Sequence, residues 1–176
     1  MVVKIAILLV IISAFANTAL AQTSLPPSVL KTDIRSLKGE SFRLGEGNSK
    51  VKIIFLLASW CGPCRFAVKD LNQIHRAYPE TDVEIVGLTN ENPQTDEIKV
   101  RNFVRKNRVK FNVGWMNLEM ERVFTHEKYP GLVPIIIVLN SERQVDTRLL
   151  GYKMKVTPNK LIEVVKRIIN TQGRKP

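Results

Sequence analysis

Three runs of apolar residues interrupt an otherwise mixed pattern of hydrophobic and polar positions along the chain. The runs are VKIIFLLAS (51–59), DVEIVGLT (82–89) and VPIIIVLN (133–140), and all three contain β-branched residues. Short continuous apolar runs of this kind are typical of strands that are buried on both faces of a sheet. The pattern therefore predicts three central strands at these positions.

Helical periodicity follows the first run and recurs near the C-terminus. One apolar stripe has the spacing of a helix that ends before Pro79, and it consists of Cys64, Ala67, Leu71, Ile74 and Tyr78. Thr95 is a predicted cap for a second helix that contains residues 99–110. The last helix is predicted to begin with Thr157 as its cap and Pro158 at its first position.

Weaker signals complete the pattern. Residues 29–34 and 41–44 predict a short hairpin, residues 110–116 a short strand, and residues 118–125 a short helix. Residues 144–152 are expected to pair with the third apolar run across a polar turn. Strands and helices in this order predict an α/β protein with a mixed central sheet flanked by helices.

The first 21 residues form a candidate signal peptide. Lys4 is the only charged residue in it, an apolar stretch follows, and Ala19-Leu20-Ala21 fits the small-x-small pattern of a cleavage site. The stretch is shorter than the ~20 residues of a bilayer span, and a retained membrane anchor is the alternative. We predict cleavage after Ala21 and a periplasmic or secreted protein. The segments predicted are a signal peptide (1–21), an N-terminal extension (22–40), one domain (41–172) and a C-terminal tail (173–176).

Lysine and arginine outnumber the acidic residues 27 to 16, which gives a formal net charge of +11. The densest basic run, KVRNFVRKNRVK (99–110), carries Val100, Phe103 and Val104 at helical spacing. We interpret it as an amphipathic helix with a solvated basic face. The functional alternative is contact with an acidic partner or with anionic lipid headgroups at a membrane surface.

The only two cysteines, Cys61 and Cys64, come directly after the first apolar run, in the sequence WCGPC. A disulfide that closes so short a loop would barely restrict the unfolded chain, so a structural staple is a poor explanation. Zinc needs four ligands, and His75 and His126 lack the required spacing. Covalent haem attachment needs a histidine after the second cysteine, where Arg65 stands. A redox couple remains.

The position of the pair suits redox chemistry. Cys61 lies at a helix N-terminus, where backbone N–H groups and the helix dipole stabilise a thiolate, so we predict that it is the nucleophile. Cys64 begins the apolar stripe and should face inward as the resolving thiol. Pro63 limits the flexibility of the turn. Trp60 is either a rigid apolar shoulder beside the nucleophile or a core aromatic residue.

The WCGPC motif and the order of strands and helices resemble the thioredoxin superfamily over residues 41–169. The resemblance implies a thioredoxin-like sandwich in which Cys61 and Cys64 are catalytic. It also implies a cis proline at the start of a later strand, and Pro134 in GLVPIII fits that place. Val133 would then offer its backbone to an extended substrate segment. The substrate-positioning residues implied are Trp60, Gly62, Pro63, Val133 and Pro134.

The long separation of Cys64 from Pro134 resembles the exported TlpA-like and redoxin-type branch, which carries an inserted strand–helix segment and an N-terminal hairpin. This branch implies a thiol-disulfide oxidoreductase of the periplasm or cell envelope that exchanges disulfides with protein substrates. The Gly62–Pro63 dipeptide resembles that of thioredoxin and indicates a reductant, which a membrane-bound donor would have to keep reduced in an oxidising periplasm. We expect no metal, and no cofactor besides the Cys61–Cys64 disulfide. We expect a monomer, an acidic or extended thiol protein as partner, and no nucleic-acid binding.

Three positions depart from the pattern of the resembled families. Thioredoxin keeps a buried aspartate where this chain has Phe55, and TlpA-like proteins often have a glutamate where it has Ala67. The helix proline expected five residues after the second cysteine is Lys69. A water, or a carboxylate from a distant loop such as Glu91, would have to accept the proton of Cys64.

Two other functions remain open from the sequence. The missing carboxylates would suit a binding or chaperone module that uses its thiols without turnover. A peroxiredoxin-like peroxidase shares the fold of the redoxin branch, but its site resembles a pattern with threonine three residues before the attacking cysteine, where this chain has Ala58.

Overall fold

The structure is a computed structural model of the chain, and its described part comprises residues 24–128 and 130–172. The predicted signal peptide and the predicted tail lie outside these residues. Its elements are α2 (Pro27–Lys31), β1 (Ile34–Arg35), β2 (Ser41–Phe42), β3 (Val51–Leu56), α3 (Cys64–Ala77), β4 (Val83–Thr89), α4 (Glu97–Lys106), β5 (Asn112–Trp115), α5 (Leu118–Phe124), β6 (Ile135–Leu139), β7 (Val145–Leu150) and α6 (Val156–Gln172). No helix in the described part is long and apolar enough to cross a membrane.

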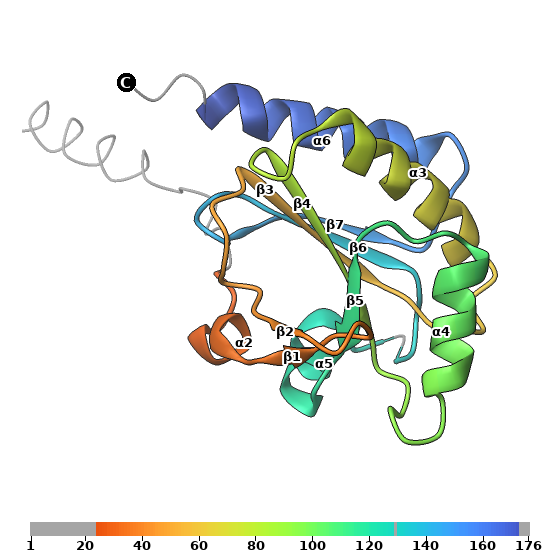
Figure 1. Cartoon of the computed structure of the whole chain (residues 1–176). Coiled ribbons are helices and arrows are strands. Elements are labelled where there is room, and N and C mark those ends of the chain that lie inside the picture. The colour runs from red at the N-terminus through yellow and green to blue at the C-terminus, as the bar shows by residue number, and fades with distance from the viewer. Residues whose placement is uncertain (1–23, 129, 173–176) are drawn as a thin grey trace, which may run out of the picture.

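One mixed sheet forms the centre of the molecule (Figure 1), with its strands in the order β5–β4–β3–β6–β7. Strand β3 is its middle strand, parallel to β4 and antiparallel to β6. Every residue of β3 and of β6 is buried, Lys52 of β3 included, in agreement with the burial predicted for both runs. The predicted mixed α/β sheet is confirmed.

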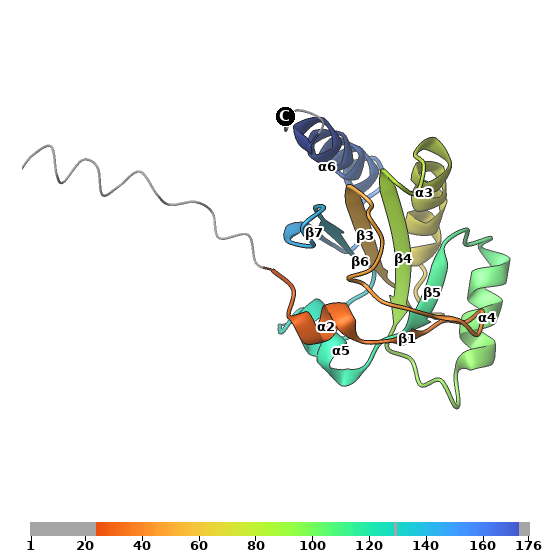
Figure 2. The same ribbon diagram turned by 60° about the vertical axis from the view of Figure 1, so that its left-hand side comes forward.

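Two layers of helices cover the two faces of this sheet (Figures 1 and 2). Alternate residues of the strands point to opposite faces, so that Ile53 and Phe55 belong to one hydrophobic cluster and Ile54 and Leu56 to the other. The first cluster is closed by α3, α4 and α6, and the second by α2, α5 and the hairpin β1–β2. Both cysteines lie in the first cluster.

The N-terminal hairpin is confirmed at Ile34–Arg35 and Ser41–Phe42, but residues 29–31 are not part of it. They belong to the short helix α2, which begins at Pro27 and buries Val29. Proline at a first helical position has a backbone angle that already suits the helix, and the single apolar stripe of so short a segment does not separate helix from strand.

Both predicted threonine caps are wrong. Asp96, not Thr95, occupies the cap position of α4. Helix α6 begins at Val156, one residue before Thr157, and the Thr157 hydroxyl accepts a hydrogen bond from the backbone N–H of Lys153 at 2.9 Å. Local sequence places the start of a helix only to within one or two residues, because neighbouring positions can serve as the cap.

Candidate active site

Cys61 and Cys64 lie on the loop between β3 and α3, and they form a disulfide with their Cα atoms 5.3 Å apart. Strand β3 ends at Leu56, and a turn closed by the bond from the Cys61 N–H to the Ala58 carbonyl (3.1 Å) turns the chain toward α3. The helix then begins at Cys64, with Pro63 at its cap position. A buried central strand and a helix anchored in the core thus fix the two ends of the loop.

The first turn of α3 is directed at the sulfur of Cys61. The backbone N–H of Cys64 donates a hydrogen bond to the Cys61 Sγ at 3.2 Å. Cys64 is fully buried, whereas Cys61 keeps 3% of its surface exposed. The inward position predicted for Cys64 is confirmed. Because helix N-terminal N–H groups carry partial positive charge, this arrangement favours a thiolate on Cys61 once the disulfide is reduced.

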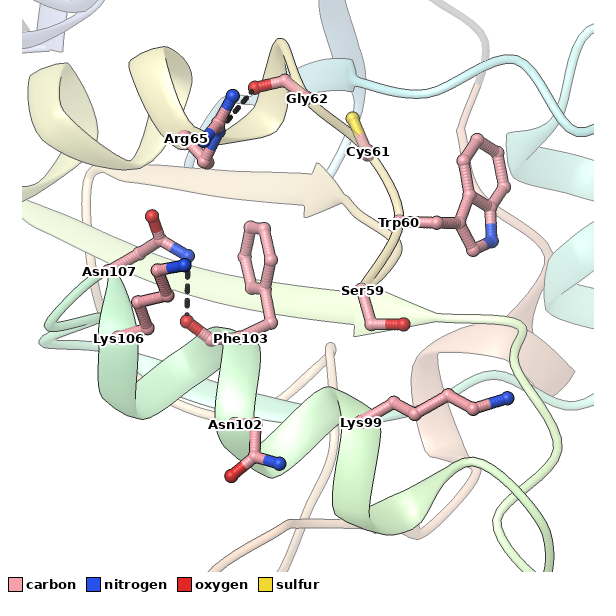
Figure 3. Close-up of a pocket in the computed structure, with 10 residues that line it drawn as sticks. All are labelled: Ser59, Trp60, Cys61, Gly62, Arg65, Lys99, Asn102, Phe103, Lys106 and Asn107. Atoms are coloured by element: carbon pink, nitrogen blue, oxygen red, sulfur yellow. Dashed lines mark hydrogen bonds between the residues drawn. The ribbon is translucent and has the colours of Figure 1, made fainter.

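Trp60 is 67% exposed, which excludes the interpretation of this residue as a core aromatic. Its indole stands beside Cys61 at the surface of the loop (Figure 3). On the other side of the cysteine, the Nε of Arg65 donates to the Gly62 carbonyl at 3.2 Å. Gly62 and Pro63 therefore lie in a turn that is fixed before them by the bond from the Cys61 N–H to the Ala58 carbonyl and after them by Arg65.

A carboxylate from the loop after the neighbouring strand β4 binds the start of the active-site loop. Glu91 follows the end of β4, and its carboxylate accepts the Ser59 backbone N–H at 2.6 Å and the Ser59 hydroxyl at 2.5 Å. It also accepts the Thr89 hydroxyl at 3.3 Å. From the sequence, Glu91 is expected only as an acid on a distant loop. Its position after a buried strand parallel to β3 was the signal for its proximity, because the carboxyl ends of parallel strands meet at one sheet edge.

The environment beneath the disulfide is apolar. Phe55 is fully buried and packs edge-on against Phe111, with ring centres 6.2 Å apart, and Ala67 is also buried. Lys69 is exposed on α3. The three departures from the family pattern therefore leave these positions without a carboxylate, and the hydrogen bonds described for Glu91 go to Ser59 and Thr89 rather than to a cysteine.

The peptide bond between Val133 and Pro134 is cis, as predicted. Pro134 comes directly before β6, and its carbonyl accepts the Gly151 N–H at 2.8 Å, which links it to the end of β7. Val133 packs against the hydrophobic cluster that contains both cysteines. The structure thus brings this peptide and the disulfide to the same core.

A groove of about 500 Å³ runs along the outer side of Cys61. Figure 3 shows its two walls, the active-site loop with the first turn of α3 on one side and α4 on the other. The residues that line it are Ser59, Trp60, Cys61, Gly62, Arg65, Lys99, Asn102, Phe103, Lys106 and Asn107. The amphipathic helix predicted for residues 99–110 is present as α4, with Val100 and Phe103 buried, but it ends at Lys106, and residues 107–110 lie outside it.

Within the described ranges, no group of three or more histidine, cysteine, aspartate or glutamate side chains could hold a metal ion. What the site does hold is a disulfide at a helix N-terminus, open on one side and apolar beneath. This arrangement can accept and release two electrons by exchange with another thiol or disulfide.

The chain resembles known proteins over most of its length. The profile of the AhpC/TSA family matches residues 22–145. The thiol-disulfide oxidoreductase ResA of Bacillus cereus is 26% identical over 141 residues, covering 75% of this chain and 76% of ResA.

The solved structures that share the fold include two with different described activities. One is a secreted disulfide oxidoreductase of Mycobacterium tuberculosis, with a TM-score of 0.63, 17% identity, and coverage of 81% of this chain and 99% of that one. The other is the Bacterioferritin Comigratory Protein of Xanthomonas campestris, described by its alkyl peroxide reduction activity, with a TM-score of 0.64 and 14% identity. It covers 84% of this chain and 98% of its own. The thioredoxin-like fold is confirmed, and the fold alone does not separate the two chemistries.

Proposed function

The chain belongs to the AhpC/TSA family, and we propose that this thiol-disulfide oxidoreductase reduces disulfides of protein substrates outside the cytoplasm. The observation that carries the proposal is the Cys61–Cys64 pair, one sulfur at the open end of a helix and the other buried beneath it. Cys61 acts as the nucleophile and Cys64 as the resolving thiol.

The reaction proceeds in two exchanges. The Cys61 thiolate attacks one sulfur of the substrate disulfide, so that a mixed disulfide forms and the other substrate sulfur leaves as a thiolate. Cys64 then loses its proton and attacks Cys61, which forms the intramolecular disulfide and releases the second substrate thiol. Two electrons pass to the substrate, and the Cys61–Cys64 disulfide is afterwards reduced by a dithiol donor.

The proton of Cys64 goes to water in this proposal. Phe55 and Ala67 offer no base, and the carboxylate of Glu91 is held by Ser59. We therefore expect the resolving step to be slower than in proteins that place a carboxylate under the second cysteine.

The residues around the pair position the substrate. Trp60 supplies an exposed apolar surface beside Cys61, and Gly62 and Pro63 form the turn between the two cysteines. Val133, next to Pro134, offers its backbone groups to an extended segment, as the resemblance to thioredoxins implies.

We place the protein in the periplasm or outside the cell, with residues 1–21 as a signal peptide and 41–172 as the thioredoxin-like domain. The apolar stretch and cleavage pattern of that segment support this location, as does the description of the M. tuberculosis structure as secreted. In an oxidising compartment the Cys61–Cys64 disulfide must be reduced again after each turnover, so a membrane-bound dithiol donor completes the cycle. The protein acts as a monomer, without nucleic acid or a cofactor.

Reduction of insulin by the purified protein, with dithiothreitol as the donor, tests the activity. We expect Cys61→Ser to abolish turnover and Cys64→Ser to accumulate a mixed disulfide on Cys61 that mass spectrometry detects. Turnover by both variants would contradict the mechanism. Thiol-dependent binding without turnover would instead support a chaperone module, and rapid consumption of hydrogen peroxide would support a peroxidase.

Equilibration with glutathione buffers tests the direction of electron flow. The Gly62–Pro63 dipeptide is shared with thioredoxin, whose potential lies near −270 mV, so we expect a reducing value. A potential above about −150 mV, toward the strongly oxidising proteins, would overturn the assignment as a reductant.

A further inference from the structure

The groove beside Cys61 is built from two segments that are far apart in the sequence. The loop at 59–62 and Arg65 form one wall, and residues 99–107 of α4 and its C-terminal end form the other. Because Cys61 lines the groove, a substrate that reaches its sulfur from this side must lie along α4 (Figure 3).

The charges on the two walls are positive. The charged side chains that line the groove are Arg65, Lys99 and Lys106, and no carboxylate is among the lining residues. Lys99 is held by Asp96 at 2.8 Å, and that hydrogen bond raises the pKa of Lys99. No ion pair involves Arg65 or Lys106 in the described part of the chain.

The free positive charge is therefore concentrated at one end. In Figure 3, Arg65 and Lys106 lie at the end away from Trp60, whereas Lys99 lies at the Trp60 end. Asn72 of α3 donates to the Arg108 carbonyl at 2.9 Å and accepts the Lys110 N–H at 3.1 Å. These two hydrogen bonds fix the residues that follow α4 against α3. The C-terminal end of α4, which carries Lys106, is therefore held in place by the core of the protein.

We propose that this groove binds an acidic stretch of the substrate protein next to the disulfide that is reduced, with its carboxylates at the Arg65–Lys106 end. The inference rests on the proposed function and adds the class of substrate that the site prefers. The apolar surface of Trp60 contacts the other side of the substrate cystine. Two electrons pass from the Cys61–Cys64 dithiol to the substrate disulfide, and no further reactant is needed.

Two synthetic peptides with the same disulfide loop test the preference. One carries a short run of glutamates beside the first cysteine, and the other carries glutamines at the same positions. We expect kcat/KM to be about fivefold higher for the glutamate peptide. Exposed charge pairs add little to the binding free energy, and they act mostly by raising the association rate. The preference should disappear at about 1 M salt, where screening confines charge interactions to ~3 Å.

Charge reversal at Lys106 tests whether the preference for the glutamate peptide arises in the groove. Lys106→Glu should remove or invert it, measured as the ratio of kcat/KM for the glutamate peptide to kcat/KM for the glutamine peptide. Lys160→Glu makes the same change of net charge on α6, outside the groove, and should keep the preference. Arg65 is unsuitable as a probe because it follows Cys64 directly and bonds the turn between the cysteines.

Several results would overturn the inference. Equal rates for the two peptides with the wild-type protein would do so, provided the glutamine peptide is turned over; no turnover of either peptide would instead contradict the proposed function. Loss of the preference in Lys160→Glu would show that net charge alone is responsible. Sedimentation with phosphatidylglycerol vesicles that Lys106→Glu abolishes would show that the face binds lipid headgroups rather than a protein.

Discussion

At the scale of single residues, the chemistry of Cys61 depends on the atoms that surround its sulfur. The Cys64 N–H approaches Sγ at 3.2 Å, Trp60 covers one flank without closing it, and Cys64 lies beneath. The sequence predicted the placement of the two sulfurs, because Cys-x-x-Cys after a buried strand places both on the first turn of a helix, but it left Trp60 open between an exposed shoulder and a core residue. The parallel strand before Glu91 indicates that this residue lies near the same sheet edge, but the sequence does not show that its carboxylate accepts from Ser59.

Removal of the Glu91 carboxylate should loosen the active-site loop. Glu91→Ala leaves the Ser59 N–H and hydroxyl without their acceptor, and we expect a loss of about 1–3 kcal/mol in the free energy of unfolding. Insulin reduction should slow several-fold. Glu91→Gln keeps one acceptor oxygen and should lie in between, and Glu163→Ala, exposed on α6, is the matched control. Equal stability and activity of the Glu91→Ala and Glu163→Ala proteins would show that the contact is unimportant.

Tyr152 provides a test in alkaline solution. Its hydroxyl donates to Asp70, and burial together with this carboxylate raises its pKa to about 12, from an ordinary value of 10.0. A group whose pKa is raised by folding stabilises the protein below its unfolded pKa and loses that contribution as the pH rises through its folded pKa. The stability advantage of wild type over Tyr152→Phe should therefore shrink between about pH 10 and 12.

Urea denaturation of both proteins at several pH values measures this advantage. Tyr78→Phe is the control, because no hydrogen bond from Tyr78 to a carboxylate is present among the described contacts. An advantage that stays constant up to pH 12 would contradict the role given to the Tyr152–Asp70 bond.

At the scale of elements, the long apolar runs and the long amphipathic helices were predictable, and so were the short elements β5 and α5, whereas helix α2 was not. Strands β3, β4 and β6 lie within the three apolar runs. A strand that is buried on both faces needs apolar residues at nearly every position, so such a run predicts it. Helix α2 was not predicted. A five-residue helix has little intrinsic stability, and this one is stabilised by the packing of Val29 into the hydrophobic cluster under the sheet.

The hairpin docks on the edge strand β5 through a glycine. A Cβ at Gly114 would lie 2.5 Å from the Ile34 Cγ2 and 3.0 Å from the Arg35 carbonyl oxygen. We expect Gly114→Ala to lower the free energy of unfolding by about 1–3 kcal/mol, because backbone atoms of the hairpin must shift. Urea denaturation checks this, with Gly62→Ala as a control, where the nearest atom is 4.0 Å away. A Gly114→Ala protein as stable as that control would show that the hairpin adjusts freely.

At the scale of the whole molecule, the fold unites a redox pair and a basic helix that the sequence keeps apart. Their separate identities could be predicted, the one from its motif and the other from its periodicity. Their meeting in one groove could not, because it depends on how α4 packs across the same face of the sheet as α3. The net charge of +11 alone says nothing of this position.

The reactivity of Cys61 in the reduced protein tests the central claim most directly. In a Cys64→Ser variant, the rate of alkylation by iodoacetamide, followed by mass spectrometry across pH, reports the thiolate of Cys61 alone. We expect the half-maximal rate to fall well below about pH 8.5, the ordinary pKa of a cysteine, because helix N–H groups stabilise the thiolate. A half-maximal rate at or above about pH 8.5 would contradict the account.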